Sequence, residues 1–269
     1  MGFGPSWVRT AFLGLVLAAA LGAGQASAAE KGYLTAADRT GVMAWLPPKP
    51  ADGSPADSAD YANFWATRAL VASARGLQAH EDDVYDPSVV TPRMQAAAGV
   101  EISARTTPVT FALLSRTQED VGGLIDVAKG PFDKGRLRPF VRFPAGQHCE
   151  LTPNDIKFDL GGTSSYPSGH AAFSWLWALV LAEAEPDRAD AVMHWGWEFG
   201  ESRVICGFHY PSDVAGGRLA ATAIFAKLQT NPEFQKDLAA ARKELAAARG
   251  VKPASPDPLE RLKRVFRKH

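Results

Sequence analysis

Cysteine is scarce in this chain of 269 residues, which contains only Cys149 and Cys206. Two cysteines exclude the disulfide-dense scaffolds of small secreted domains. Because no metal-ligand spacing surrounds them, they also make a poor zinc site. Two interpretations stay open: a single disulfide between them, or two buried free thiols.

The chain also lacks an excess of charge of either sign. It has 29 lysine and arginine residues against 29 aspartate and glutamate residues, so its formal net charge is zero. Nucleic acids and anionic membrane surfaces attract proteins with a basic excess. The composition therefore gives no reason to expect either partner.

Long apolar runs are missing after the beginning of the sequence. Arg9 precedes an apolar stretch at 11–22, and Ala26-Ser27-Ala28 has the small residues of a cleavage site. We expect residues 1–28 to be a signal peptide that is cleaved near Ala28, with a membrane anchor as the alternative. The mature protein would then be periplasmic or secreted, where a disulfide is permitted. The strongest later run, 173–181, is too short to cross a bilayer and indicates a buried helix.

Alternation of apolar and polar residues, the pattern of a half-buried strand, is also missing. Apolar residues recur instead at helical spacing through most of the chain. The sequence therefore predicts an all-α fold in a single-domain helical bundle. The expected helices cover about residues 59–74, 117–129, 167–185, 189–202, 211 onward and 231–249.

The sequence predicts four parts: a signal peptide (1–28), an irregular N-terminal arm (29–56), one domain (57–250) and a basic C-terminal tail (251–269). The arm is predicted from the prolines and glycine clustered between Pro47 and Pro55. The domain is long enough to hold one large core. The tail is amphipathic, and we interpret it as a solvated terminal helix, with a binding arm as the alternative.

The first candidate motif for a ligand-binding or catalytic role is the string Ser165-Tyr166-Pro167-Ser168-Gly169-His170. Backbone N–H groups at a helix start can bind an oxyanion, because the helix dipole favours negative charge there. Pro167 would open such a helix, and Gly169 would let a ligand approach the backbone. Ser168 would offer a hydroxyl, and His170 would point to the ligand from the first turn. An ordinary capped helix start is the alternative for so short a match.

A second string is Ser202-Arg203-Val204-Ile205-Cys206-Gly207-Phe208-His209-Tyr210-Pro211-Ser212-Asp213. His209 and Asp213 are four residues apart, a spacing that places them on one face of a helix. A carboxylate bonded to Nδ1–H would fix the histidine tautomer and leave the Nε2 lone pair free to attack. The planar fork of Arg203 suits phosphate oxygens. A plain surface pair and a structural ion pair are the alternatives.

Arg138-Pro139, preceded by Lys129, is the third element. The proline disfavours helical backbone at Arg138, so a helix is expected to end before it. Taken alone, this basic run would be a solvated face. The run indicates a functional role only when it is considered together with the two strings above.

In this order the three elements resemble the signature of the type 2 phosphatidic acid phosphatase (PAP2) superfamily, which includes acid phosphatases, lipid phosphatases and vanadium haloperoxidases. The chain is most similar to the class A bacterial non-specific acid phosphatases, and the similarity is weakest before about residue 110. The matching segments are 128–129, 138–140, 165–170, 198–207 and 231–235. The resemblance implies a helical bundle of the PAP2/haloperoxidase type, hydrolysis of small phosphomonoesters, no metal or other cofactor, and a homo-oligomer.

The resemblance also implies roles for individual residues. His209 would be the nucleophile that forms a phosphohistidine, Asp213 would orient it, and His170 would protonate the leaving alcohol. The groups that bind the phosphoryl oxygens would be Lys129, Arg138, Arg203, Ser168 and the Gly169 N–H. Such a set is chemically sufficient, because phosphoryl transfer depends mainly on positioning and charge stabilisation. A protonated acid beside a neutral nucleophile predicts a bell-shaped pH profile.

The lysine is the one departure from the pattern. The family usually leaves six residues between it and Arg-Pro, whereas eight separate Lys129 from Arg138. In a continuous helix that spacing, about two and a half turns, would put the two side chains on opposite faces. A break at Pro131 or Gly135 would bring them together. We favour Lys129, with Lys134 as the competing candidate.

Other functions of the same superfamily stay open from the sequence. They are a vanadate-dependent haloperoxidase, a membrane-peripheral lipid phosphatase and a phosphate-binding protein without catalysis. The last is disfavoured, since binding alone needs neither a nucleophile nor an acid. If Cys149 and Cys206 are bridged, the disulfide would brace the site. The four tryptophans beside the motifs are predicted to pack in the core: Trp175, Trp177, Trp195 and Trp197.

Overall fold

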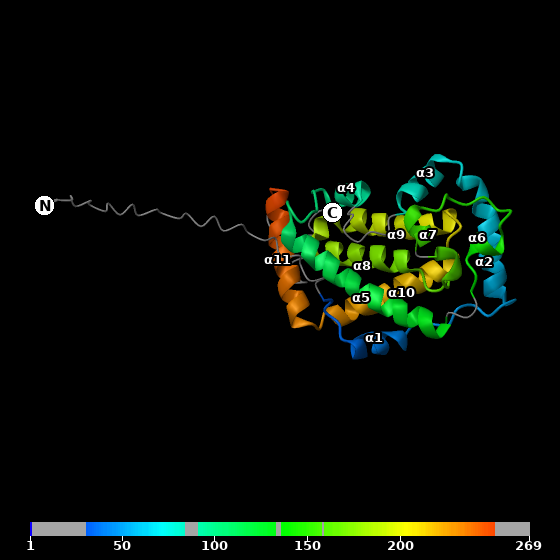
Figure 1. Cartoon of the computed structure of the whole chain (residues 1–269), viewed down its shortest axis with the longest axis horizontal. Helices are drawn as coiled ribbons and strands as arrows, with labels where there is room; N and C mark the ends of the chain where they lie inside the picture. Colours follow the sequence, from blue (N-terminus) through cyan, green and yellow to red (C-terminus); the bar gives the residue numbers. More distant parts are fainter. Residues whose placement is uncertain (2–30, 84–90, 133–135, 158, 251–269) are drawn as a thin grey trace, which may run out of the picture.

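The structure is a computed structural model that describes Met1 and residues 31–83, 91–132, 136–157 and 159–250. Over these residues it contains eleven α-helices, three short 3-10 helices and no strand (Figure 1). The predicted all-α fold is therefore confirmed. The predicted signal peptide (1–28) and basic tail (251–269) lie outside the described residues, apart from Met1.

Six of the helices are longer than twelve residues. They are α2 (Pro55–Thr67), α5 (Pro108–Phe132), α8 (Gly169–Ala184), α9 (Ala189–Ile205), α10 (Pro211–Leu228) and α11 (Pro232–Ala248). The shorter ones are α1 (Ala36–Met43), α3 (Ala74–Glu81), α4 (Pro92–Ala98), α6 (Pro139–Arg142), α7 (Pro153–Lys157), η1 (Arg68–Leu70), η2 (Leu160–Gly162) and η3 (Pro186–Arg188). Among the described residues, no helix has the length and apolar character needed to cross a membrane.

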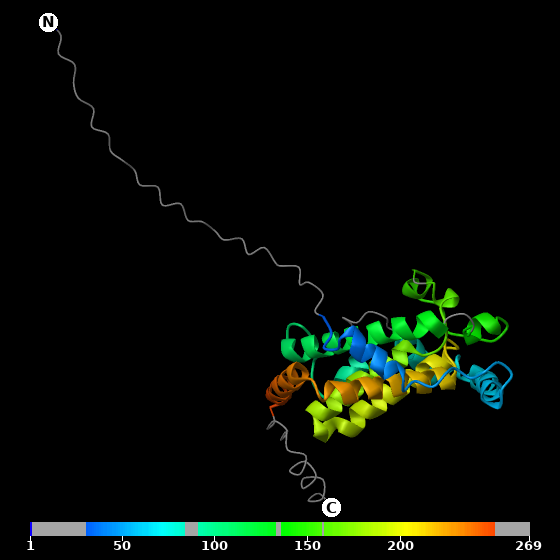
Figure 2. The same cartoon turned by 90° about the horizontal axis from the view of Figure 1, so that it is seen from below.

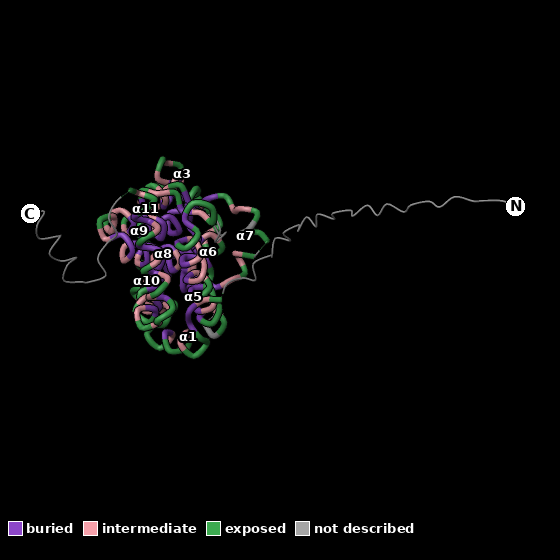
Figure 3. The backbone as a smooth tube through the Cα atoms, turned by 90° about the vertical axis from the view of Figure 1, so that its left-hand side faces the viewer, coloured by how far each residue is buried: buried purple, intermediate pink, exposed green. Residues whose placement is uncertain are grey.

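Helix α8 is the centre of the bundle. It is apolar around nearly its whole circumference, which is the pattern of a helix buried on all sides. It packs against α9, α10, α5 and α11, and in Figure 3 it lies within the buried interior. Helix α11 crosses one end of the bundle in both Figure 1 and Figure 2, while α6 lies at the opposite end. The candidate site lies at that opposite end, where α8 and α10 begin.

The tryptophan prediction holds for three residues and is wrong for one. Trp177 and Trp195 are buried in the main core. Trp175 is partly buried and packs against that core, whereas Trp197 is 50% exposed. Both rings lie beside the Arg218 guanidinium on the outer surface, where an indole can pack against a cation without entering the core.

Prolines open seven of the eleven α-helices over the described residues: α2, α4, α5, α6, α7, α10 and α11. Proline suits the first helical position because its missing N–H would have no helical partner there. Helix α8 differs from our expectation. It begins at Gly169, and Pro167 lies before the cap. Ser168 occupies the cap position because its hydroxyl accepts a hydrogen bond from the Ala171 N–H.

Three other expectations differ from the structure. The arm predicted as irregular at 29–56 contains α1, which starts because Thr35 and Asp38 cap each other's backbone N–H groups. The helix expected at 59–74 is divided into α2, η1 and the start of α3. The helix expected to start at Thr117 begins nine residues earlier, at Pro108. Thr117 therefore lies in the interior of α5. Its hydroxyl donates to the Leu114 carbonyl of the same helix, so it does not cap the helix start.

Candidate active site

A cleft of about 160 Å³ lies beside the end of α5, the start of α8 and His209, which precedes α10. Five residues that the sequence analysis singled out line it: Lys129, Arg138, Gly169, His170 and His209. The remaining three, Ser168, Arg203 and Asp213, are fully buried and do not line the cleft. Segments separated by up to 84 residues in sequence, from Lys129 to Asp213, therefore meet at one site.

Helices α8 and α10 are joined at their first residues. Ser168 caps α8, and its own N–H donates to the Asp213 carbonyl at 3.0 Å. Gly169 and His170 follow in the first turn and face the cleft. The positive end of the α8 dipole therefore points at the cleft, as expected of an oxyanion site.

His209 presents an unprotonated Nε2. This atom lies 3.0 Å from Nη1 of Arg138, and a guanidinium can only donate hydrogen bonds. The Nε2 atom must therefore be the acceptor, which places the ring proton on Nδ1. Burial first, and then Arg138, Lys129 and Arg203, lower the pKa of His209 well below its ordinary value. The lowered pKa therefore favours the neutral ring, with its Nε2 lone pair available.

Asp213 lies beside the other ring nitrogen of His209. Its Oδ2 is 3.6 Å from Nδ1, slightly longer than a hydrogen bond. The helical spacing that suggested this pair is not the cause of their proximity, because His209 precedes α10. The cause is helix capping, since Asp213 at the third position of α10 accepts the Tyr210 N–H at 2.8 Å.

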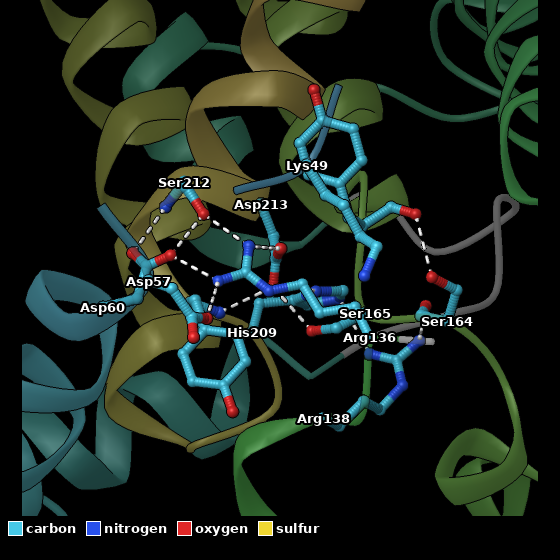
Figure 4. Close-up of polar contacts among 12 residues, drawn as sticks. Lys49, Asp57, Asp60, Arg136, Arg138, Ser164, Ser165, His209, Ser212 and Asp213 are labelled. Atoms are coloured by element: carbon cyan, nitrogen blue, oxygen red, sulfur yellow. Dashed lines mark hydrogen bonds and ion pairs between the residues drawn. The ribbon is translucent and has the colours of Figure 1, made fainter. Parts of the chain in front are cut away.

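Arg136 forms the centre of a buried polar network behind Asp213 (Figure 4). Its guanidinium donates to Asp213 Oδ1 at 2.8 Å, to Ser212 and to Asp60 on α2. Asp57 lies 3.6 Å away, and Ser165 donates to the second oxygen of Asp213. Burial raises the pKa of Asp213, while Arg136, Ser165 and Tyr210 oppose that rise. This network holds the carboxylate in place on both oxygens.

Arg203 has two donor atoms that no described residue satisfies. Its side chain is fully buried, its guanidinium lies over the Phe208 ring, and Nη1 pairs with Asp83. The Nε and Nη2 atoms have no hydrogen-bond partner among the residues described. Unsatisfied buried donors are costly, so this guanidinium is suited to bind an oxyanion.

His170 is fully buried close to these cations. Its Nε2 lies 3.9 Å from Oδ1 of Asp83. Burial first, and then Arg203, His209, Arg138 and Lys129, lower its pKa well below the ordinary value. In the absence of an anion the neutral form of the ring is therefore favoured.

The two remaining cations, Lys129 and Arg138, reach the cleft from either side of the point where α5 ends. Lys129 lies in the last turn of α5, which continues through Pro131 and ends at Phe132. Arg138 caps α6 and donates to the Phe208 carbonyl and to Thr163 at 3.0 Å. Because α5 ends between them, both face one cleft despite their unusual spacing. The competing candidate, Lys134, lies outside the described residues.

Cys149 and Cys206 form a disulfide in the structure. The Cys149 N–H also donates to the Cys206 carbonyl at 3.1 Å. This pairing joins the segment after α6 to the end of α9, three residues before His209. No three His, Cys, Asp or Glu side chains are grouped to hold a metal ion in the part of the chain that the structure describes.

Sequence reasoning did not assign Arg136, Asp60 or Asp83. Arg136 stands two residues before Arg138 in a basic run that resembled a solvated face. Only the contact with Asp213, 77 residues away, gives it a place in the site. Asp60 and Asp83 lie in the region of weakest resemblance and meet their arginines across 76 and 120 residues. No local signal could identify them.

Comparisons with known proteins agree with this geometry. The PAP2 superfamily model matches residues 121–232. A non-specific acid phosphatase of Salmonella typhi is 40% identical over 201 residues, which are 75% of this chain and 78% of the relative. One of Providencia stuartii is 37% identical (80% and 84%), and an acid phosphatase of Zymomonas mobilis is 34% identical (81% and 80%). The chain therefore belongs to the PAP2 superfamily, and it is an acid phosphatase of that superfamily.

Proposed function

We propose that the protein hydrolyses small phosphomonoesters through a phosphohistidine on His209, without a metal ion. The observation that carries this proposal is Arg203, whose buried Nε and Nη2 lack partners beside a histidine with a free Nε2 lone pair. A phosphoryl group in the cleft would satisfy both donors and would meet the nucleophile. Lys129, Arg138, the Ser168 hydroxyl and the Gly169 N–H complete its positive surroundings.

The reaction would proceed in two steps. His209 Nε2 attacks phosphorus, the bond from phosphorus to the ester oxygen breaks, and His170 gives a proton to that oxygen. Water then attacks the phosphohistidine, His170 takes the proton of that water, and phosphate leaves with His209 regenerated. Asp213 stabilises the positive ring that forms in between.

The low pKa of His170 in the free site is compatible with an acid role. Its pKa is lowered by burial and then by neighbouring cations, led by Arg203. A bound phosphate dianion offsets those cations and raises the pKa again. We therefore expect His170 to take up its proton together with the substrate, and the reaction to be favoured in acid.

p-Nitrophenyl phosphate hydrolysis in excess EDTA, from acid to neutral pH, tests the chemistry. We expect turnover to survive chelation, to peak in acid and to fall by several orders of magnitude in His209→Ala. The matched control is His194→Ala, because that histidine is exposed on α9. Rapid quenching in base should trap labelled phosphate on the wild-type protein. Turnover lost in EDTA, or retained in His209→Ala, would contradict the proposal.

We further propose that residues 1–28 direct export and are removed near Ala28, and that the mature chain forms a homo-oligomer. The A-x-A pattern at 26–28 supports cleavage, and the family resemblance supports assembly. The mass of the protein purified from a periplasmic fraction tests the first. Light scattering of the purified protein tests the second.

A further inference from the structure

A second cleft, of about 170 Å³, continues from the phosphate cleft along α5. The two share Ile125, Asp126, Gly169 and His170. Beyond these residues the second cleft is lined by Gln118, Val121, Gly122 and Phe173. It contains none of the phosphate-binding cations, so its chemistry differs from that of the first.

One face of α5 forms a wall of both clefts. Positions 118, 121, 122, 125, 126 and 129 recur at the three- and four-residue spacing of a single helical stripe. Lys129 stands at the phosphate end, and Gln118 stands about 16 Å along the axis. A molecule that places phosphate near Lys129 therefore has its remaining part directed along this stripe.

His170 lies at the junction of the two clefts. In the proposed reaction this residue protonates the ester oxygen, and the organic group is attached to that same oxygen. The leaving group must consequently extend from His170, and the second cleft is the space that adjoins it.

The lining of the second cleft suits a flat ring. Val121 and Ile125 are aliphatic, and Phe173 contacts the His170 ring at 5.6 Å between centroids. Gly122 leaves the wall open, since a Cβ atom there would meet nothing within 4 Å. A cavity of about 150 Å³ in another protein holds one benzene molecule. The second cleft therefore has room for about one ring.

Two polar groups, on Gln118 and Asp126, limit which substituents the ring can carry. Oε1 of Gln118 is buried with no hydrogen-bond partner among the described residues, so it can accept from an N–H or O–H at the distal edge. The Asp126 carboxylate disfavours a second anionic group.

We propose that the second cleft is a leaving-group subsite for phosphomonoesters of single-ring aromatic alcohols, with Gln118 accepting from a donor on the ring. The inference rests on the proposed phosphatase activity and names the substrate class of that site. The ring would lie between Val121 and Ile125 on α5 and Phe173 on α8. Aromatic contact with Phe173 adds to the gain from burying the ring.

Benzyl phosphate and ethyl phosphate give a matched comparison, because both are esters of primary alcohols of similar acidity. We expect kcat/KM to be roughly tenfold higher for benzyl phosphate. Gly122→Leu should fill the second cleft and leave the phosphate-binding residues in place. We expect it to lower kcat/KM for benzyl phosphate but not for ethyl phosphate, so that the two kcat/KM values become similar. Gly122→Ala and Gly41→Leu are the controls, since Gly41 is an exposed helical glycine on α1 with equal space.

Gln118 is tested with 3-aminobenzyl phosphate, whose amino group can donate. The amino ester should be hydrolysed several-fold more efficiently than the benzyl ester by the wild-type protein. Gln118→Leu should abolish that advantage and leave ethyl phosphate unchanged.

The outcomes separate this inference from the proposed function. Equal kcat/KM for benzyl and ethyl phosphate in the wild-type protein, or a preference that Gly122→Leu leaves intact, would overturn the subsite while both esters are still hydrolysed. If neither ester is hydrolysed, the proposed function itself fails.

Discussion

Arg136 compensates several buried carboxylates near His209, although its side chain does not line the cleft. Removing one partner of a buried ion pair is costly because the other charge remains in a poorly solvated place. We expect Arg136→Met to lower the free energy of unfolding by about 3–5 kcal/mol. Urea denaturation measures this loss.

The same variant tests whether Arg136 acts through Asp213. Without it, Asp213 should bind a proton more readily, so the pH profile of kcat should shift while KM for phosphate esters changes little. Arg136→Lys should restore part of both properties. An unchanged pH profile in a stable Arg136→Met protein would show that the network serves folding alone.

Asp83 pairs with Nη1 of Arg203, beside the two donors, Nε and Nη2, that we expect to bind phosphate oxygens. Burial raises the pKa of Asp83, Arg203 lowers it, and Asp155 adds to the rise. As the pH falls through that raised pKa, Asp83 loses its charge and no longer offsets the positive charge of Arg203. Inhibition by inorganic phosphate should therefore strengthen as the pH falls, with His170 close by contributing in the same direction.

Asp83→Asn separates the two contributions. The variant should bind phosphate about tenfold more tightly than wild type near pH 7, and the two proteins should converge in acid. The inhibition constant for phosphate from pH 4 to 7 is the measurement. Weaker binding in Asp83→Asn would mean that the Asp83 carboxylate favours phosphate binding by orienting Arg203, and that this effect outweighs its repulsion of the anion.

At the residue scale, the sequence singled out the histidines and several polar groups at the cleft, but not the buried charged residues that pair with them. His170, His209 and Arg138 stand in short strings whose chemistry is readable without a structure. Arg136, Asp60 and Asp83 have no such context, because their partners lie 76 to 120 residues away. Charge alone cannot distinguish a buried arginine from a solvated one.

At the scale of elements, helix existence was more predictable than helix limits. Proline and cap residues predicted the starts near Pro211 and Asn231, because their effect is local. The division of 59–74 depends on packing of α2 and α3 against α9, which no local pattern records. The start of α5 does have a local signal in Pro108, because proline suits the first helical position.

The contact between α8 and α10 gives a prediction at this scale. A Cβ atom on Gly217 would lie 2.3 Å from the Ser168 carbonyl, and backbone cannot rotate away as a side chain can. Gly217→Ala should push α10 from the start of α8. We expect a loss of about 1–3 kcal/mol in the free energy of unfolding, together with a clear loss of kcat.

Gly41→Ala is the control for that substitution. It also replaces a helical glycine, but it has open space around it and should be neutral or stabilising. Thermal unfolding and turnover of both variants measure the difference. Full activity in Gly217→Ala would mean that the two helix starts tolerate movement.

At the scale of the whole molecule, the disulfide restrains the chain over a separation of 57 residues. A loop of that length corresponds to about 4 kcal/mol of stability through the entropy of the unfolded chain. The Cys149→Ser/Cys206→Ser double variant should lose most of this amount in urea denaturation. The wild-type protein treated with reductant should show the same loss of stability. Equal stability with and without reductant would contradict the prediction.

The pH dependence of stability also belongs to the whole molecule, because it compares the folded and unfolded chains. Burial, with the site cations, lowers the pKa of both His170 and His209 in the folded state. In the unfolded chain these histidines return to about 6.5. As the pH falls below that value, the unfolded chain binds protons that the folded chain does not, so the two histidines reduce stability in acid.

A bound dianion should reverse this effect at His170. It raises the pKa of His170 in the folded protein, so that the ring can bind a proton in acid solution. Sulfate is a suitable probe, since it is tetrahedral and does not titrate in this range. We expect sulfate to raise the melting temperature more at pH 5 than at pH 7, and we expect His170→Asn to remove most of that difference. The general salting effect of sulfate does not depend on His170, so the variant controls for it. An equal shift at both pH values would mean that His170 takes up no proton with the anion, and another group would then have to protonate the leaving alcohol.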